Sequence, residues 1–293
     1  MKNLHVKNLV FAGLIVIFSG VWSKGFSQNV SGVSLSGSAI KLAYNYPSDK
    51  DIKYLNTSKV IQDMDINGQS MLVNVTSYFR CNVRSAGRQG ENLNLEIRID
   101  TMAQNIETPE GSAGGTMTEV KGKVFNMIIT PEGKVIDLTE AAKIVYIVEG
   151  SGESNLEQSF LNHFPVLPAV KVKTGDSWIT RDTLNSKTQS MSMWMPVEAN
   201  YKFEGIEKIN DITCARISAT LTGSRKMNTQ TQGMDINTTG TFTGTTMLLF
   251  AVKKGYFIKE TVTTRMKGII EILNQNMSFP VVMDITSINE VMK

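Results

Sequence analysis

Residues 92–100, with the sequence NLNLEIRID, decide the fold class. Leucine or isoleucine occupies every second position from Leu93 to Ile99, and Asn94, Glu96 and Arg98 lie between them. Successive side chains of a β-strand point to opposite faces of a sheet. This alternation therefore predicts a strand with one buried and one solvated face, as in an antiparallel sheet that covers a core on one side.

The same alternation recurs on both sides of a strong turn signal. Apolar residues occupy every second position of 40–44 and most such positions of 71–83, and Asn67-Gly68 precedes the second run. Both turn residues tolerate positive φ angles, which two-residue hairpin turns require. The pattern predicts that 51–66 and 69–83 pair as a long antiparallel hairpin. Pro131-Glu132-Gly133 and Lys253-Lys254-Gly255 predict two further hairpins.

The middle of the chain follows a helical pattern. Asp137 with Glu140, and Ser154 with Glu157, have the spacing of an N-cap residue and the third residue of a helix. Leu156, Phe160 and Phe164 then recur at helical spacing. We expect short helices at 138–148 and 154–164, with Pro165 and Pro168 opening an extended link and strands resuming near Asp176.

The two strand-rich parts resemble a diverged repeat. Gly115–Thr118 (GTMT) is echoed 125 residues later by Gly240–Thr243 (GTFT), and Gly133–Ile136 is echoed 122 residues later by Gly255–Ile258. Each glycine- and threonine-rich segment is expected to be a loop. The chain is therefore divided into a first β-rich half at 28–137, a helical interlude and linker at 138–170, and a second half at 171–293. The fold class is mainly β, an antiparallel curved sheet or half-barrel whose helices cover its concave face.

Residues 1–27 are typical of a secretory signal peptide. Lys2 and Lys7 precede the apolar run 9–22, and Gly25 and Ser27 place small residues before a predicted cleavage site at Gln28. The run is too short for a comfortable membrane span, and an uncleaved N-terminal anchor is the alternative. Cleavage leaves 293 − 27 = 266 residues and removes three lysines and no acidic residue, so the formal net charge falls from +3 to 0. We expect a periplasmic or secreted protein without a stable membrane span, and no nucleic-acid partner.

Two short motifs resemble a known family. The segment Phe164–Pro168 (FPVLP), followed by Gly175–Trp178 (GDSW), resembles a signature of exported Bacteroidota proteins in domain-of-unknown-function family 6263. Cys214 with Ile217, before a glycine-rich segment, is also similar. The resemblance covers most of the mature chain. It implies an envelope or secreted location and a β-rich fold, and it brings no catalytic residues because the family has no assigned activity.

The residue types that carry enzyme chemistry are sparse. His163 is the only histidine of the mature chain, and no Gly-x-Ser-x-Gly motif occurs. The position of His163 at the end of the second predicted helix favours a role as a helix C-terminal cation over a role as a catalytic base. Glu96 and Asp100 flank Arg98 on a solvated strand face. The segment 111–115 is expected to be a flexible hairpin loop, since it lacks the context of a phosphate-binding loop. We assign no catalytic residue, no cofactor and no enzyme activity.

Sulfur-containing residues leave two questions open. Met191, Met193 and Met195 share one strand face, which suits either Cu(I) binding or ordinary apolar packing. We favour packing and assign no metal ligand. Cys81 and Cys214 could form a disulfide in an oxidising compartment. Cys81 lies on an apolar strand face, whereas Cys214 lies on the same strand face as Arg216 and Ser218. Because the two cysteines lie on faces of different kinds, the pattern disfavours a disulfide between them.

Long apolar strand faces without a catalytic set favour a non-enzymatic envelope protein. We expect it to bind an apolar small molecule or an envelope protein partner. A structural or adhesion-like module and an undetected hydrolase are the alternatives. The size and lining of the interior distinguish among the three.

Overall fold

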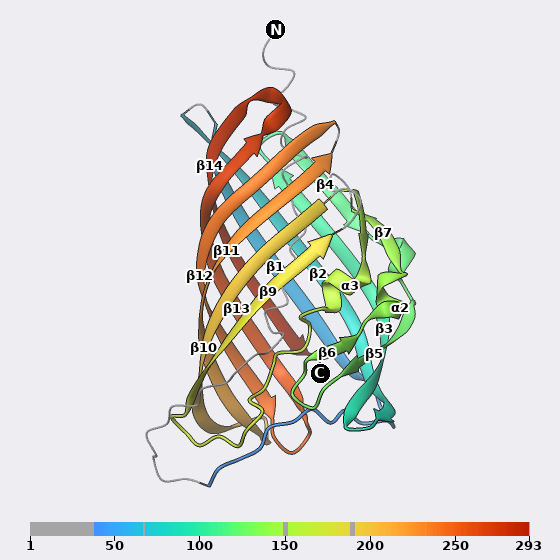
Figure 1. The fold of residues 1–293 in the computed structure, drawn as a ribbon. Helices are drawn as coiled ribbons and strands as arrows, with labels where there is room; N and C mark the ends of the chain where they lie inside the picture. The colour runs from blue at the N-terminus through green and yellow to red at the C-terminus, as the bar shows by residue number, and fades with distance from the viewer. Residues whose placement is uncertain (1–37, 67, 149–151, 188–190, 232, 293) are drawn as a thin grey trace.

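One large antiparallel sheet dominates the protein (Figure 1). The computed structural model describes residues 38–66, 68–148, 152–187, 191–231 and 233–292, so the predicted signal peptide at 1–27 lies outside the described residues. The first strands are β1 (Ile52–Ile66), β2 (Gln69–Gln89), β3 (Asn92–Thr108), β4 (Gly111–Thr116), β5 (Val124–Ile129) and β6 (Val135–Asp137). The later strands are β9 (Ser177–Lys187), β10 (Met191–Ile209), β11 (Ile212–Thr231), β12 (Met234–Ala251), β13 (Tyr256–Ile272) and β14 (Met277–Val291).

The interlude between the two sets of strands holds short elements. These are α2 (Thr139–Ala142), β7 (Val145–Val148), β8 (Gly152–Asn155) and α3 (Leu156–Phe160), and β7 pairs with β8 in a separate ribbon. Two 3₁₀ turns, η1 (Thr118–Val120) and η2 (Leu273–Gln275), complete the described elements. No helix among these elements is long and apolar enough to cross a membrane.

The strand order places the end of the chain at the centre of the sheet. The order is β6-β5-β3-β2-β1-β14-β13-β12-β11-β10-β9, with β4 paired to β3. The last strand, β14, lies between β1 and β13 and joins the strands of the two halves. Within the described chain, β6 and β9 each pair on one side only, so the sheet curves as a half-barrel without closing. The predicted fold class is confirmed.

The predicted hairpins are confirmed in register. Ile66 pairs with Gln69, and the β1–β2 ladder continues to Ile52 opposite Val83. Gly68 has a φ of +81°, which the two-residue turn requires. Ile129 pairs with Val135 around the turn at Pro131–Gly133, and Ala251 pairs with Tyr256 around the turn at Lys253–Gly255.

The predicted helices at 138–148 and 154–164 are wrong in extent. Helix α2 ends at Ala142, and residues 145–148 form strand β7 because Val145, Ile147 and Val148 are β-branched and pair with 152–155. The side chain of Asp137 accepts hydrogen bonds from the backbone N–H (2.8 Å) and hydroxyl (2.6 Å) of Thr139. Glu140 instead accepts from the backbone N–H of Asn126 at 2.7 Å, so it does not close a capping box.

The glycine- and threonine-rich segments are strands rather than loops. Residues 111–115 lie in β4, and 240–243 lie in the middle of β12. Gly240 faces Gly268 across the β12–β13 ladder. A Cβ atom on Gly268 would lie 2.1 Å from the carbonyl oxygen of Thr239, and one on Gly240 would lie 2.6 Å from that of Lys267. A side chain at either position would therefore meet the backbone of the neighbouring strand, and glycine avoids this contact.

Candidate functional site

The concave face of the sheet is divided by a band of buried polar residues, here called the polar belt. The belt has two rows of residues. The first row runs across β13, β14 and β1 and contains Glu260, Asn289 and Asn56. The second row runs across β14, β1, β2 and β3 and contains Ser287, Ser58, Ser77 and Gln104. Each is at most 9% exposed. Ser58 Oγ, Gln104 Oε1 and Asn289 Oδ1 have no hydrogen-bond partner within the described chain. Buried polar atoms are usually paired with protein or water, so the belt marks an unusual interior.

Aromatic residues fill the concave face on one side of the polar belt. Segments 38–48 and 156–172 pack there, and Tyr44 donates a hydrogen bond to the carbonyl oxygen of Pro165 at 2.7 Å. The ring of Tyr44 meets the rings of Phe164 and Phe250 edge-on at 5.8 and 5.3 Å. We call this side the aromatic half, and we call the end of the sheet that it fills the closed end. It is a packed core of the kind that aromatic pairs stabilise.

His163 and Cys81 lie together inside the aromatic half. His163 Nε2 is 3.9 Å from Cys81 Sγ, and the imidazole is enclosed by the rings of Tyr54, Phe79 and Phe257 among others. Burial lowers the pKa of His163 to about 3 and raises the pKa of the Cys81 thiol well above its usual value. A nucleophilic cysteine needs the opposite shifts, a thiolate beside an imidazolium. The pair is therefore neutral, and its environment opposes catalysis.

The expectation that His163 is a helix C-terminal cation is wrong. Helix α3 ends at Phe160, and the His163 side chain turns inward, where it is 3% exposed. Charging it would require desolvating an imidazolium among aromatic rings. Cys81 and Cys214 are both free, buried thiols, and Cys214 Sγ faces the carbonyl oxygen of Ile212 at 3.6 Å.

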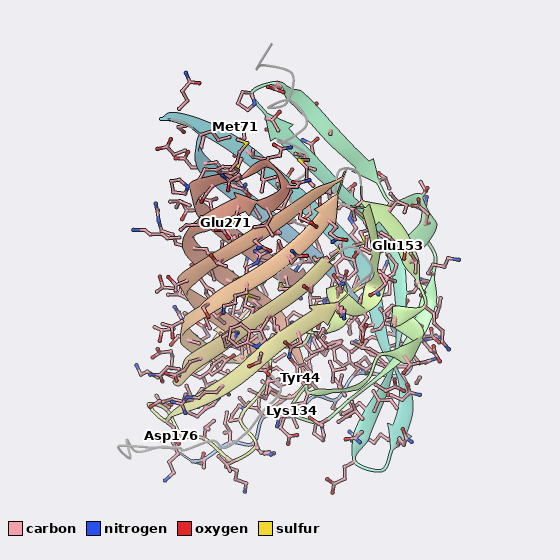
Figure 2. All side chains as sticks on the ribbon, turned by 45° about the horizontal axis from the view of Figure 1, so that its top comes forward. Tyr44, Met71, Lys134, Glu153, Asp176 and Glu271 are labelled. Atoms are coloured by element: carbon pink, nitrogen blue, oxygen red, sulfur yellow. The ribbon has the colours of Figure 1, made fainter. Side chains whose placement is uncertain are left out.

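Methionines line the concave face on the other side of the polar belt. This side, here called the methionine half, extends to the end of the sheet where β1 turns into β2, β11 into β12 and β13 into β14. Its methionines are Met64, Met71, Met191, Met193, Met195, Met227, Met234, Met266, Met277 and Met283. Figure 2 shows Met71 near this end and Tyr44 near the closed end. Thioether side chains adapt to irregular partners, and surfaces that bind varied apolar ligands are rich in them.

The helices are positioned over the aromatic half. The main contacts of α2 are with β5 and α3, and those of α3 are with α2 and β8. Phe160 of α3 packs on Phe79 of β2 and Phe125 of β5 with ring centroids 5.3 and 4.9 Å apart. The helical interlude therefore covers the concave face near the closed end.

Arg225 is buried in the methionine half. It lies on β11 in register with Gly240 and shares the concave face with Leu221, four residues before it. The side chain is 3% exposed, and burial lowers the pKa of the guanidinium to about 10. Nη2 donates to Met227 Sδ at 2.9 Å, whereas Nε has no hydrogen-bond partner in the described chain. The sequence alone does not single out Arg225, because only the pairing of β11 with its neighbours shows that this residue lies on the concave face.

Two hollows lie along β9–β12. One of about 630 Å³ is located where Pro196 interrupts the β10–β11 ladder, and most of its lining, such as Arg181 and Glu198, faces outward from the sheet. The other, of about 560 Å³, is likewise lined mostly by outward-facing residues, such as Trp194 and Lys226. Within the described ranges, no cluster of three or more His, Cys, Asp or Glu residues could hold a metal ion. The three methionines of β10 fall on the concave face, as their spacing predicted.

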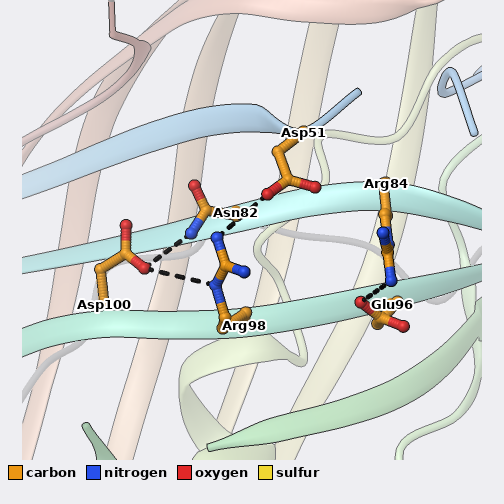
Figure 3. Close-up of polar contacts among 6 residues, drawn as sticks. All are labelled: Asp51, Asn82, Arg84, Glu96, Arg98 and Asp100. Carbon is orange, nitrogen blue, oxygen red and sulfur yellow. Dashed lines mark hydrogen bonds and ion pairs between the residues drawn. The ribbon is translucent and has the colours of Figure 1, made fainter. Parts of the chain in front are cut away.

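The convex face carries ordinary ion pairs (Figure 3). Glu96 binds Arg84 at 2.6 Å, and Arg98 binds Asp51 at 3.1 Å and Asp100 at 3.7 Å. These side chains are partly or largely exposed, so each pair contributes little to stability. Glu96 and Asp100 belong to a solvated face, as predicted, and they do not converge on a pocket.

The residues behind the family resemblance have structural roles. Pro165 accepts the Tyr44 hydrogen bond, and Asp176 Oδ2 accepts from the Lys173 backbone N–H at 2.8 Å. Trp178 is buried and stacks on Tyr201 with ring centroids 5.3 Å apart. Together they fix the path of the chain from the interlude into β9.

Comparisons with known proteins give weak similarity. No protein-family model matches the chain, and no curated protein matches it. Among solved structures, OccK5 (OpdH) of Pseudomonas aeruginosa has 6% identity and a TM-score of 0.29, over 85% of this chain and 100% of that one. OccK2 (OpdF) of the same organism, in complex with glucuronate, has 8% identity and a TM-score of 0.24 over the same shares. A DUF1329 family protein from Desulfovibrio piger has 10% identity and a TM-score of 0.14, over 81% and 85%. Membership of family 6263 stays a prediction.

Proposed function

We propose that this is an exported envelope protein that binds an apolar ligand on the methionine half of its concave face and catalyses no reaction. The observation that carries the proposal is the contrast between the two halves. The aromatic half is filled by segments 38–48 and 156–172, whereas the other half is lined by methionines, of which Met64, Met227, Met234, Met266 and Met283 are buried. Apolar, largely preformed concave surfaces with few polar groups are typical of small-molecule sites.

The export part of the proposal rests on the sequence. The positive residues, apolar run and small residues of 1–27 have the order of a secretory signal peptide. Mass spectrometry of the protein recovered from its native host tests it. A mature chain that begins at Gln28 supports export, and an intact Met1 contradicts cleavage.

Ligand binding is tested with delipidated protein and the fluorescent apolar probe N-phenyl-1-naphthylamine. We expect saturable binding that Met266→Trp weakens severalfold, because Met266 lies on the concave face of β13 opposite Met283. Thr263→Trp is the matched control, since Thr263 is exposed on the opposite face of the same strand. Delipidated protein that binds no apolar probe contradicts the proposal and favours the structural or adhesion-like alternative.

A further inference from the structure

The hollow of about 560 Å³ on the convex face of β9–β12 contains an exposed tryptophan. The side chain of Trp194 is 43% exposed, whereas Trp178, the other tryptophan of the described residues, is buried. An indole ring combines a large flat apolar surface with one N–H donor. Trp194 therefore presents an apolar platform to solvent, on the face of the sheet opposite to the apolar site proposed above.

Polar side chains surround Trp194 in register. Trp194 pairs with Asn185 on β9 and with Lys226 on β11, and Lys226 in turn pairs with Thr239 on β12. A second row, one pair of residues nearer to the β9–β10 turn, consists of Lys187, Ser192, Asn228 and Asn237. All the residues of both rows line the hollow. With strands about 4.8 Å apart and alternate residues about 7 Å apart, the two rows form a surface about 14 Å wide and about 7 Å long.

The asparagines of this surface have unused hydrogen-bonding capacity. A primary amide offers both donors and an acceptor. Asn228 Nδ2 donates to Asn237 Oδ1 at 2.8 Å, and within the described chain Asn228 Oδ1 and Asn237 Nδ2 form no further hydrogen bond. The side chain of Asn185 is exposed next to the indole ring. These amides suit a ligand that itself both donates and accepts, as the neighbouring hydroxyl groups of a sugar do.

Positive charge lies on both sides of the indole ring. Lys226 Nζ lies over the ring of Trp194, 5.7 Å from its centroid, and Lys187 is on the neighbouring strand β9. Neither lysine takes part in an ion pair within the described chain, and no carboxylate is among the described residues that line the hollow. Asp235 on β12 and Glu271 on β13 lie two and three strands away from Trp194. The charge beside the ring therefore favours an anionic ligand.

We propose that this hollow binds an oligosaccharide that contains uronic acid, with one sugar ring on Trp194. The C–H face of the sugar packs on the indole ring, and the asparagine, serine and threonine side chains exchange hydrogen bonds with its hydroxyl groups. Lys226 donates a charge-assisted hydrogen bond to the carboxylate. A cation–π contact is weak at an exposed site, so the Lys226 ammonium turns readily from the ring to a carboxylate beside it.

A sugar suits the hollow better than a nucleic acid, the other ligand that stacks on tryptophan beside lysines. A single strand of nucleic acid is bound by a basic groove that follows its phosphates and by aromatic residues on which successive bases stack. Here one aromatic ring and two lysines lie among three asparagines, a serine and a threonine. This composition matches a ligand with many hydroxyl groups and few charges.

Titration calorimetry with the purified protein tests the inference. The probes are tetramers of galacturonate and of mannuronate and a hyaluronan tetrasaccharide, and their methyl esters are neutral counterparts with the same sugar skeleton. We expect at least one acidic tetramer to bind, to quench the tryptophan fluorescence, and to bind severalfold more tightly than its ester. Trp194→Ala should weaken binding at least about tenfold, and Lys226→Met should abolish the preference for the acid.

Tyr78→Ala is the matched control. Tyr78 on β2 is 39% exposed and has Arg80 over its ring at 5.9 Å, but it lines neither hollow. This variant should bind the tetramer as the wild type does, because an exposed ring with a cation is not enough to form the site.

Several results would overturn the inference. If no acidic tetramer binds to the wild type, the site does not exist, and this result needs no variant to fold. Binding that Trp194→Ala leaves unchanged, an ester that binds as tightly as its acid, or a thymidine oligonucleotide that binds more tightly than every tetramer would also contradict it. The apolar probe reports on the other face of the sheet, so the failure of one proposal leaves the other intact.

Discussion

At the scale of single residues, Glu260 should control how stability depends on pH. Glu260 is 4% exposed and forms no salt bridge in the described chain, and burial raises its pKa from 4.5 to about 8. Between these two pH values the folded state retains a proton that the unfolded state has lost. The free energy of unfolding therefore falls by about 1.4 kcal/mol for each pH unit that the solution rises through this window.

Glu260→Gln removes this loss because the amide resembles the protonated acid. We expect the variant to exceed the wild type in unfolding free energy by on the order of 3 kcal/mol at neutral pH, with the difference vanishing near the unfolded-state pKa. Urea denaturation across the pH range measures it. Glu290→Gln is the control, since Glu290 is half-exposed and pairs with Lys259 at 2.8 Å. A difference that does not change with pH would contradict the assignment of a buried, protonated carboxyl.

His163 has the opposite sign. Its pKa falls from 6.5 to about 3 on folding, so below the higher value the unfolded state binds a proton that the folded state refuses. Stability should therefore decline by about 1.4 kcal/mol per unit as the pH falls through this window. In His163→Phe, where the new ring suits the surrounding rings, the unfolding free energy should fall less steeply below pH 6.5, and its pH dependence above pH 6.5 should be unchanged. Denaturant titrations at a series of pH values measure this. An equally steep fall in the variant below pH 6.5 would show that His163 is protonated in the folded protein.

At the scale of elements, Gly240 and Gly268 should matter for the pairing of β12 with β13. Gly268→Ala places a Cβ atom against the Thr239 carbonyl oxygen, 2.1 Å away before relaxation. Forcing the strands apart should cost about 1–3 kcal/mol. Gly115→Ala on β4 is the matched control, because a Cβ atom there meets nothing within 4 Å. Thermal unfolding of both variants distinguishes them, and equal transition temperatures would mean that the pairing of β12 with β13 tolerates a side chain at position 268.

The sequence predicted elements well where local pattern and tertiary environment agree. Alternation predicts β2 and β3 because each has one buried face, and the turn at Asn67-Gly68 predicts β1 as the partner of β2. The capping spacing at Asp137 overpredicts a helix at 138–148, because the β-branched run after Lys143 favours a strand there. The segment 240–243 lacks the usual pattern of a strand, because glycine is rare inside strands. Its role appears only when Gly240 is paired with Gly268.

At the scale of the whole molecule, the two halves lie side by side in one sheet and are joined where β1 pairs with β14. β9, β10 and β11 begin 125, 122 and 120 residues after β1, β2 and β3, and the duplication stays a prediction. The candidate site could not be read from the sequence, since neither Arg225 nor the polar belt follows a motif. The face that Arg225 occupies depends on the pairing of β11 with β10 and β12. The polar belt depends on the registers between β13, β14 and β1, which bring together residues that are far apart in the sequence.

The strand order also predicts where the molecule opens first. β14 and β1 lie at the centre of the sheet, each hydrogen-bonded on both sides, whereas β9 is bonded to β10 alone in the described residues. Local opening costs least where few buried contacts are lost. In native-state hydrogen exchange, we expect bonded amides of β1 and β14 to exchange only through global unfolding, and those of β9 to exchange through smaller openings. Denaturant dependence separates the two classes, because global unfolding exposes more surface and has the larger m-value. Equal protection and equal denaturant dependence in β9 and β14 would contradict the central position of the C-terminal strand.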